Sequence, residues 1–164
     1  MAHYSRTTRT SEAGFTLIEV LVVSVIIAIL AALTFVNFGR PQNDTAVDST
    51  VDTLVSDIRA QQILSMSGDT GSKTTPQTHG IYIEAGQYTL YTGNTFTAGA
   101  SNNFVVSMPD GTSLTTKLTG GKLLFKLGTG EVSGYSGSKN TITVASGSAT
   151  STITLNRFGA TTVN

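Results

Sequence analysis

From residue 14 to residue 38 the chain reads GFTLIEVLVVSVIIAILAALTFVNF, and Glu19 is the only formal charge in this stretch. As one α-helix, residues 15–38 would be about 36 Å long, which exceeds the roughly 30 Å hydrocarbon core of a membrane. Residues 1–14 are polar and contain Arg6 and Arg9. Because basic residues flank membrane helices on the cytoplasmic side, we expect a cytoplasmic leader over residues 1–14 and everything after residue 38 outside the cytoplasm.

A second helical segment is expected after Gly39-Arg40-Pro41, a tripeptide that should weaken or break the first helix. Apolar side chains recur at helical spacing at Val47, Val51, Leu54, Val55, Ile58 and Met66, while Asp44, Asp48, Asp52 and Asp57 lie mostly off that stripe. This pattern predicts an amphipathic helix over residues 39–66, packed on a head formed by residues 67–164. Gly68 is a plausible stop for this helix.

From His79 onward the hydrophobic period changes to two. Residues 80–84 and 87–91 alternate around Ala85-Gly86, which predicts a β-hairpin. Further strands are expected at 104–108, 113–118, 122–127, 141–145 and 152–156, separated by turns rich in glycine, serine and proline. The expected fold class is therefore α+β: a long N-terminal helix, with a membrane half and an amphipathic half, packed on an antiparallel, β-sandwich-like head.

The composition excludes several kinds of chemistry. The 164 residues include no cysteine, which rules out a disulfide framework, a thiolate metal site and a cysteine nucleophile. Ten basic and ten acidic residues balance, and the basic ones are scattered, so no basic stripe indicates nucleic-acid binding. Only 12% of the residues are charged, and Gly, Ser, Thr and Asn are abundant after Met66, which favours a β-rich exported head over a cytosolic enzyme.

Gly14-Phe15-Thr16-Leu17-Ile18-Glu19, followed by an apolar helix, closely resembles the N-terminal signature of type IV pilins and type II secretion pseudopilins. The resemblance implies that a prepilin peptidase cuts between Gly14 and Phe15 and that the new amino group of Phe15 is N-methylated. Two other interpretations stay open. One is an ordinary secretory signal, although its apolar region would be unusually long and contain a glutamate. The other is an uncleaved membrane anchor that does not polymerise.

Glu19 distinguishes a pilin from a plain anchor. A carboxylate in an apolar helix costs about 2.5–3.5 kcal/mol at the centre of a membrane and less near the interface, so it needs a reason. The resemblance implies that Glu19 pairs with the amino group of Phe15 on a neighbouring subunit and sets the axial register; the alternative is an interfacial glutamate with its carboxylate in water. Ser24, Ala28 and Ala32 lie four apart, which permits close helix packing but also arises by chance.

The head has a looser resemblance, to the GspH/FimT minor pseudopilin family. The order of the amphipathic helix, His79-Gly80-Ile81, Tyr88-Thr89-Leu90-Tyr91, Leu124-Phe125-Lys126-Leu127-Gly128 and the closing segment 153–159 carries it. This resemblance implies a β-sandwich head packed on the helix and a place near a filament tip. The chain departs from many major pilins because it has no cysteine pair, and no carboxylate cluster suggests the calcium site of major pseudopilins.

No catalytic constellation is found, so we expect no enzyme, no metal and no cofactor. His79 is the only histidine after the leader, and we expect it to lie in a loop or at a strand edge. Asp69-Thr70-Gly71 and Asp110-Gly111 look like turns. Removal of the leader takes away Arg6, Arg9 and Glu12, which changes the balance of charge from zero to −1 and disfavours nucleic acid as a partner.

The sequence thus predicts a structural subunit, a minor pilin or pseudopilin of a type IV pilus or type II secretion filament. Its expected partners are prepilin peptidase, other pilin or pseudopilin subunits and the cytoplasmic membrane. It would be a single-pass protein of that membrane, with its head outside the cytoplasm, and part of a periplasmic or cell-surface filament after assembly. The alternatives are a major pilin and a FimT-like minor pilin that binds DNA for uptake.

Overall fold

The computed structural model describes residues 14–35, 40–71 and 73–164, and the chain divides into two compact units, residues 1–38 and 39–164. The expected leader, except for Gly14, lies outside the described residues, as do positions 36–38 of the expected first helix and Gly39 of the expected break. In the first unit, helix α1 spans Leu17–Phe35. Among the residues that are described, no helix is both long enough and apolar enough to cross a membrane.

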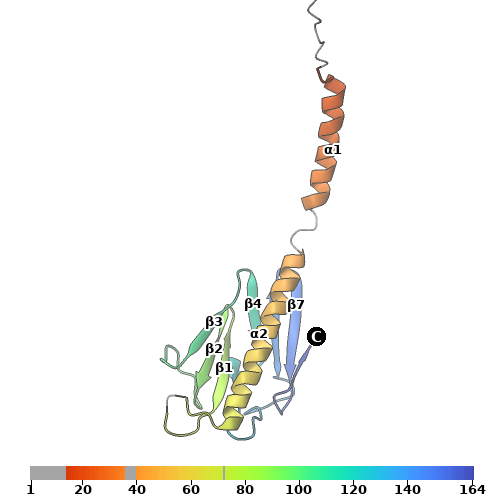
Figure 1. The fold of residues 1–164 in the computed structure, drawn as a ribbon. Coiled ribbons are helices and arrows are strands. Elements are labelled where there is room, and N and C mark those ends of the chain that lie inside the picture. Colours follow the sequence, from red (N-terminus) through yellow and green to blue (C-terminus); the bar gives the residue numbers. More distant parts are fainter. Residues whose placement is uncertain (1–13, 36–39, 72) are drawn as a thin grey trace, which may run out of the picture. The chain divides into compact units, whose positions relative to one another are not determined.

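The second unit begins with helix α2, Arg40–Ser67 (Figure 1). Pro41 lies in its first turn, where a missing backbone N–H breaks no intrahelical hydrogen bond. The helix ends as the sequence predicts: Gly68 has a φ of 70°, and the N–H of Asp69 donates to the carbonyl of Leu64 at 3.0 Å. These features are those of a Schellman motif, in which glycine takes the left-handed conformation without strain.

The predicted apolar stripe of α2 is correct over its first half. Val47, Val51, Leu54 and Ile58 are at most 4% exposed, and Val55 packs at the edge of the core. The prediction for Met66 is wrong, because its side chain is 50% exposed. Continued from Ile58 by three and seven residues, the same face buries two polar residues instead, Gln61 and Ser65.

In the described part of the head, eight strands form two four-stranded antiparallel sheets, which confirms the α+β class with antiparallel sheets. The first sheet has the order β3-β2-β1-β5, and the second has the order β4-β6-β7-β8. The strands of the first sheet are β1 (His79–Glu84), β2 (Gln87–Thr92), β3 (Phe104–Ser107) and β5 (Lys122–Leu124). Those of the second are β4 (Thr112–Thr116), β6 (Thr141–Ser146), β7 (Ala149–Leu155) and β8 (Thr161–Val163).

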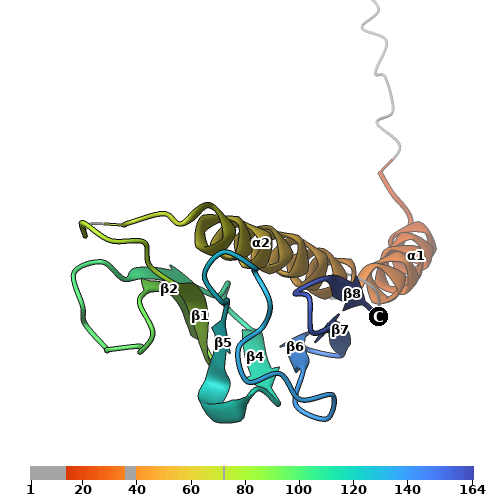
Figure 2. The same cartoon turned by 90° about the horizontal axis from the view of Figure 1, so that it is seen from below.

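Helix α2 runs across strands of both sheets and contacts β1, β6 and β7 (Figure 2). The face of α2 that carries Leu54 and Ile58 packs in one buried cluster with side chains of both sheets. These side chains are Ile81 and Leu123 of the first sheet and Ile142 and Ile153 of the second. All six side chains have an exposure of zero. Burying such aliphatic side chains stabilises a fold by about 1.5–3 kcal/mol each. One shared core therefore holds the helix and both sheets together.

Most predicted strands are present, with two differences. The expected strand at 122–127 ends at Leu124, and Phe125 continues only as an isolated bridge to Val132. Strand β8 was not predicted; it pairs with β7 through residues Ile153↔Val163, Thr154↔Thr162 and Leu155↔Thr161. A short 3₁₀ turn, η1 (Thr119–Gly121), carries the chain from the β4 side to β5.

Candidate functional site

The N-terminal candidate site begins at Gly14, which precedes α1. A Cβ added to Gly14 would meet no atom within 4 Å. The fold of the described residues therefore does not require a glycine here, and a requirement for one would have to come from another molecule.

Thr16 begins the first helix. Its hydroxyl accepts a hydrogen bond from the backbone N–H of Glu19 at 3.3 Å, and its carbonyl accepts one from the N–H of Val20 at 3.2 Å. Thr16 is thus the N-cap and Glu19 the third helical residue, and the pair has the sequence spacing of a capping box, of which the structure shows the bond to the Thr16 hydroxyl. The Thr-x-x-Glu spacing was a readable signal for this cap, and our sequence analysis missed it.

Glu19 lies in the first turn of α1, one turn after Phe15. Carboxylates are stabilised in the first turn of a helix by the partial positive charge of its unpaired N–H groups. The structure therefore gives Glu19 a local role at the helix start. Its predicted role in pairing with a second subunit is separate from that local one and is not tested by a single chain.

The described side chains of α1 are exposed on all sides of the helix. Leu17 is 84% exposed and even Val22 is 48% exposed, and Phe15, two residues before the helix, is 83% exposed. A helix that is apolar around its whole circumference is normally covered by other apolar material, because leaving it in water forfeits the hydrophobic stabilisation of every side chain. The described part of α1 thus presents a large exposed apolar surface.

The predicted small residues lie along this helix. Ser24, Ala28 and Ala32 are exposed, and their spacing of four places them on one face. The hydroxyl of Ser24 donates to the carbonyl of Leu21 at 2.8 Å, so this polar group can enter apolar surroundings with its hydrogen bond made. Phe15, Glu19 and Ser24 line the same shallow hollow. The structure therefore places Phe15, Glu19 and Ser24 at one hollow, whereas Gly14, Ala28 and Ala32 do not line it.

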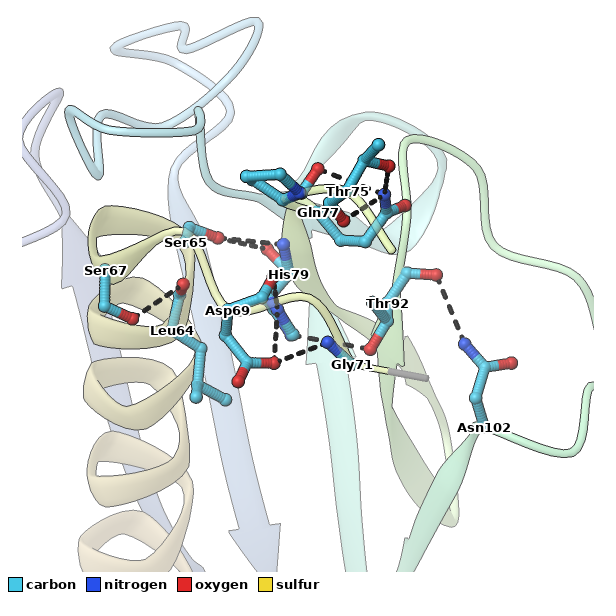
Figure 3. Close-up of polar contacts among 11 residues, drawn as sticks. Leu64, Ser65, Ser67, Asp69, Gly71, Thr75, Gln77, His79, Thr92 and Asn102 are labelled. Atoms are coloured by element: carbon cyan, nitrogen blue, oxygen red, sulfur yellow. Dashed lines mark hydrogen bonds and ion pairs between the residues drawn. The ribbon is translucent and has the colours of Figure 1, made fainter. Parts of the chain in front are cut away.

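In the head, a separate polar cluster surrounds His79 (Figure 3). His79 is the first residue of β1 and is 3% exposed. Its Nε2 lies 3.4 Å from Asp69 Oδ1, and its Nδ1 lies 3.4 Å from Thr92 Oγ1. Its backbone N–H donates to Ser65 Oγ at 2.8 Å. His79 therefore begins a strand, as expected, but it is buried and contacts three segments of the head.

The hydrogen bonds and ion pair around His79 hold neighbouring segments of the head together. Asp69 also accepts a hydrogen bond from the N–H of Gly71 at 2.8 Å, which makes the turn expected at Asp69-Thr70-Gly71 an Asx turn. The contacts join the end of α2, the following turn, β1 and β2. The ring contacts of 3.4 Å are longer than strong hydrogen bonds, and a histidine this buried has little access to a substrate. Within the described part of the chain, no three His, Cys, Asp or Glu residues are grouped to hold a metal.

A second charged cluster lies beside the 126–131 turn. Lys126 Nζ is 3.2 Å from Glu131 Oε2, and Arg157 Nη2 is 3.5 Å from Glu131 Oε1. The hydrogen bond from Lys126, together with the charge of Arg157, lowers the pKa of the Glu131 carboxyl. These exposed pairs contribute little to stability.

Among known protein families, the N-terminal residues of the chain match one family model. Residues 9–35 match the family model of the prokaryotic N-terminal methylation motif. Searches of curated proteins and of solved structures each found no match for the chain. The matched segment contains Gly14, Phe15, Glu19, Ser24, Ala28 and Ala32. The motif supports a type IV pilin-like family and indicates a chain of the prepilin type, a pilin or pseudopilin that is generally not an enzyme.

Proposed function

We propose that this chain is a minor pilin or pseudopilin, a structural subunit of a type IV pilus or type II secretion filament. The observation that carries the proposal is the N-terminal methylation motif over residues 9–35. The motif spans Gly14 and a capped apolar helix whose described side chains are exposed. A subunit that is stored in a membrane and then polymerises would cover this surface in both states.

In this proposal, prepilin peptidase hydrolyses the Gly14–Phe15 peptide bond on the cytoplasmic side of the membrane. The bond lies two residues before the start of helix α1, in non-helical backbone, where an extended substrate segment can enter a protease. A glycine before the bond leaves the most room in the enzyme. The released amino group of Phe15 is then methylated and keeps its positive charge.

Glu19 would neutralise that charge on a neighbouring subunit. A positive amino group at the start of a helix is unfavourable, since the helix dipole already places partial positive charge there. Pairing with the carboxylate of Glu19 from another α1 relieves this repulsion and removes the cost of an unpaired carboxylate among apolar side chains. Because the pair forms only between subunits, it favours assembly and fixes the axial register.

Residues 15–38 would anchor the subunit in the cytoplasmic membrane before assembly, with the head outside the cytoplasm. Ser24, Ala28 and Ala32 would let neighbouring helices approach closely in the filament. The head would be a β-sandwich-like domain of the GspH/FimT kind. The support for this finer assignment is the order of segments, in which α2 packs on β1 and on the closing strands of the second sheet.

Two substitutions in cells that contain the cognate machine test the proposal. Gly14→Val should leave a longer, membrane-bound precursor, because a branched side chain crowds the peptidase site. Glu19→Gln should be cut normally but recovered poorly in filaments, since it keeps the size of the side chain and removes its charge. Ser24→Ala, on the same side of α1, is the matched control and should assemble. Normal incorporation of Glu19→Gln would refute the register role, and normal cleavage of Gly14→Val would refute the processing site.

A further inference from the structure

A pocket of about 270 Å³ opens on the head among residues from both sheets. Its floor is apolar and includes Leu118, Val132 and Leu155, none of which is more than 8% exposed. Tyr135, which is 37% exposed, also lines it. Concave sites with an apolar floor and a few polar groups are where proteins hold small ligands.

Tyr91 brings a phenol hydroxyl to the lining of this pocket. The residue as a whole is 2% exposed, but its hydroxyl oxygen is not one of the buried, unpaired side-chain oxygens of the described residues, which belong to Thr50 and Thr112. Its ring crosses Gly80, where an added Cβ would lie 2.8 Å from Tyr91 Cζ and 2.9 Å from the hydroxyl oxygen. A tyrosine hydroxyl at the wall of an open pocket can donate a hydrogen bond to a ligand there, as it does to water. Burial also raises the pKa of Tyr91, which keeps the hydroxyl protonated and able to donate.

The charges around the pocket are all of one sign. Lys122 and Lys139 line it, and neither forms an ion pair with a described residue. The pocket lining contains no aspartate or glutamate. By contrast, Lys126 and Arg157 are both engaged by Glu131 elsewhere on the head. Two ammonium groups without a carboxylate partner beside an apolar floor favour an anionic group in the pocket.

The remaining polar groups are amides and hydroxyls. The side-chain oxygen of Asn94 accepts a hydrogen bond from Thr78, which leaves its NH₂ group free to donate. Asn140 donates to the carbonyl of Leu155, which leaves its side-chain oxygen free to accept. Thr119 and Ser133 add hydroxyls to the lining. Such a mixture of uncharged donors and acceptors suits the hydroxyl groups of a sugar.

We propose that this pocket binds an acidic sugar of the hexuronic acid class. The carboxylate of the sugar would lie between Lys122, Lys139 and the Tyr91 hydroxyl. One C–H face of the ring would pack on the negative face of the Tyr135 ring, and the sugar hydroxyls would reach Asn94 and Asn140. This activity goes beyond that of a structural subunit and does not depend on it.

The test is a titration of the full chain in detergent micelles, in which the NMR chemical shifts of the pocket residues report binding. The ligands are methyl β-glucuronide, methyl β-glucoside, which lacks the carboxylate, and benzoate, which has a carboxylate on a ring without hydroxyls. We expect saturable shifts with the glucuronide alone. Lys122→Gln combined with Lys139→Gln should weaken its binding about tenfold or more through loss of the charge-assisted contacts. Tyr91→Phe, which removes only the hydroxyl, should weaken it less.

Lys117→Gln is the matched control, because Lys117 is an exposed lysine that does not line the pocket. It should bind the glucuronide as the wild type does. Absence of saturable binding by the glucuronide would overturn the proposal, as would equal binding of the glucoside or of benzoate. Equal weakening by Lys117→Gln would also overturn it, because that result would indicate a diffuse charge effect.

Discussion

Gly80→Ala should destabilise the head through one added methyl group. Gly80 lies in β1 between two neighbours, opposite Tyr91 of β2 and Leu124 of β5. Its new Cβ would lie 2.6 Å from the carbonyl oxygen of Leu123 and 2.8 Å from Tyr91 Cζ. Both separations are shorter than the contacts that real Cβ atoms make, and the carbonyl belongs to a paired strand that cannot move alone. Overpacking of this kind costs about 1–3 kcal/mol.

The predicted loss corresponds to a fall in Tm of about 2–4 °C for each kcal/mol in a chain of this size. Near-UV circular dichroism of the full chain in detergent would follow the loss of tyrosine packing in the head. Gly86→Ala is the matched control: it lies in the β1–β2 turn, an added Cβ there meets nothing within 4 Å, and neither glycine has a positive φ. If Gly80→Ala melts at the same temperature as Gly86→Ala, the proposed crowding between β5 and Tyr91 is wrong.

Three further changes test the core and its electrostatics. Leu54→Ala should cost about 2–5 kcal/mol in the free energy of unfolding by denaturant, whereas Ile63→Ala on the same helix should cost little, because Leu54 is fully buried and Ile63 is 62% exposed. The hydroxyl of buried Tyr88 donates to Asp57 Oδ2 at 2.5 Å, and burial together with this hydrogen bond raises the pKa of Tyr88. Because the pKa of Tyr88 is higher in the folded than in the unfolded state, Tyr88 stabilises the fold at pH values below the unfolded pKa of about 10, and this stabilisation is lost as the pH rises above that pKa. Tm should therefore fall in alkali, and it should fall less in Tyr88→Phe. An equal alkaline fall in both proteins would contradict this assignment. Ser65→Ala removes the acceptor of the His79 N–H and should lower Tm, a result checked against the exposed Ser67→Ala.

The elements that could be predicted are those whose patterns are local. Ile81 and Ile83 alternate with Tyr82 and Glu84 before a two-residue turn, and the structure has the hairpin with Glu84 paired to Gln87. The first three turns of the α2 stripe and the glycine stop at Gly68 are equally local signals. These features depend on side-chain period and backbone freedom, both of which are visible in a single sequence.

The features that could not be predicted depend on partners distant in sequence. Strand β8 has only three residues, and its pairing with β7 defines it. Met66 was expected in the core because it is apolar, but the buried face of α2 ends at Ser65, which accepts the His79 N–H. The pocket beside Tyr91 combines segments from Tyr91 to Leu155, and no motif in the sequence marks it.

At the N-terminus, the glycine, the phenylalanine and the glutamate could be read directly, and the methylation motif covers them. The capping role of Thr16 could also have been predicted, because Glu19 follows Thr16 by three residues, the spacing of a capping box. Glu19 was instead interpreted only as a charge in an apolar helix. The pairing of Glu19 between subunits involves a second chain, so neither one sequence nor one chain's structure contains it.

The central claim, that this chain is a prepilin-type subunit, is tested most directly by the intact mass of the protein extracted from membranes of cells that express its own peptidase. The account predicts a chain that begins at Phe15 and carries one added methyl group on its amino terminus. A chain that still begins at Met1 would contradict it, and the intersubunit role proposed for Glu19 would then have no amino group to pair with.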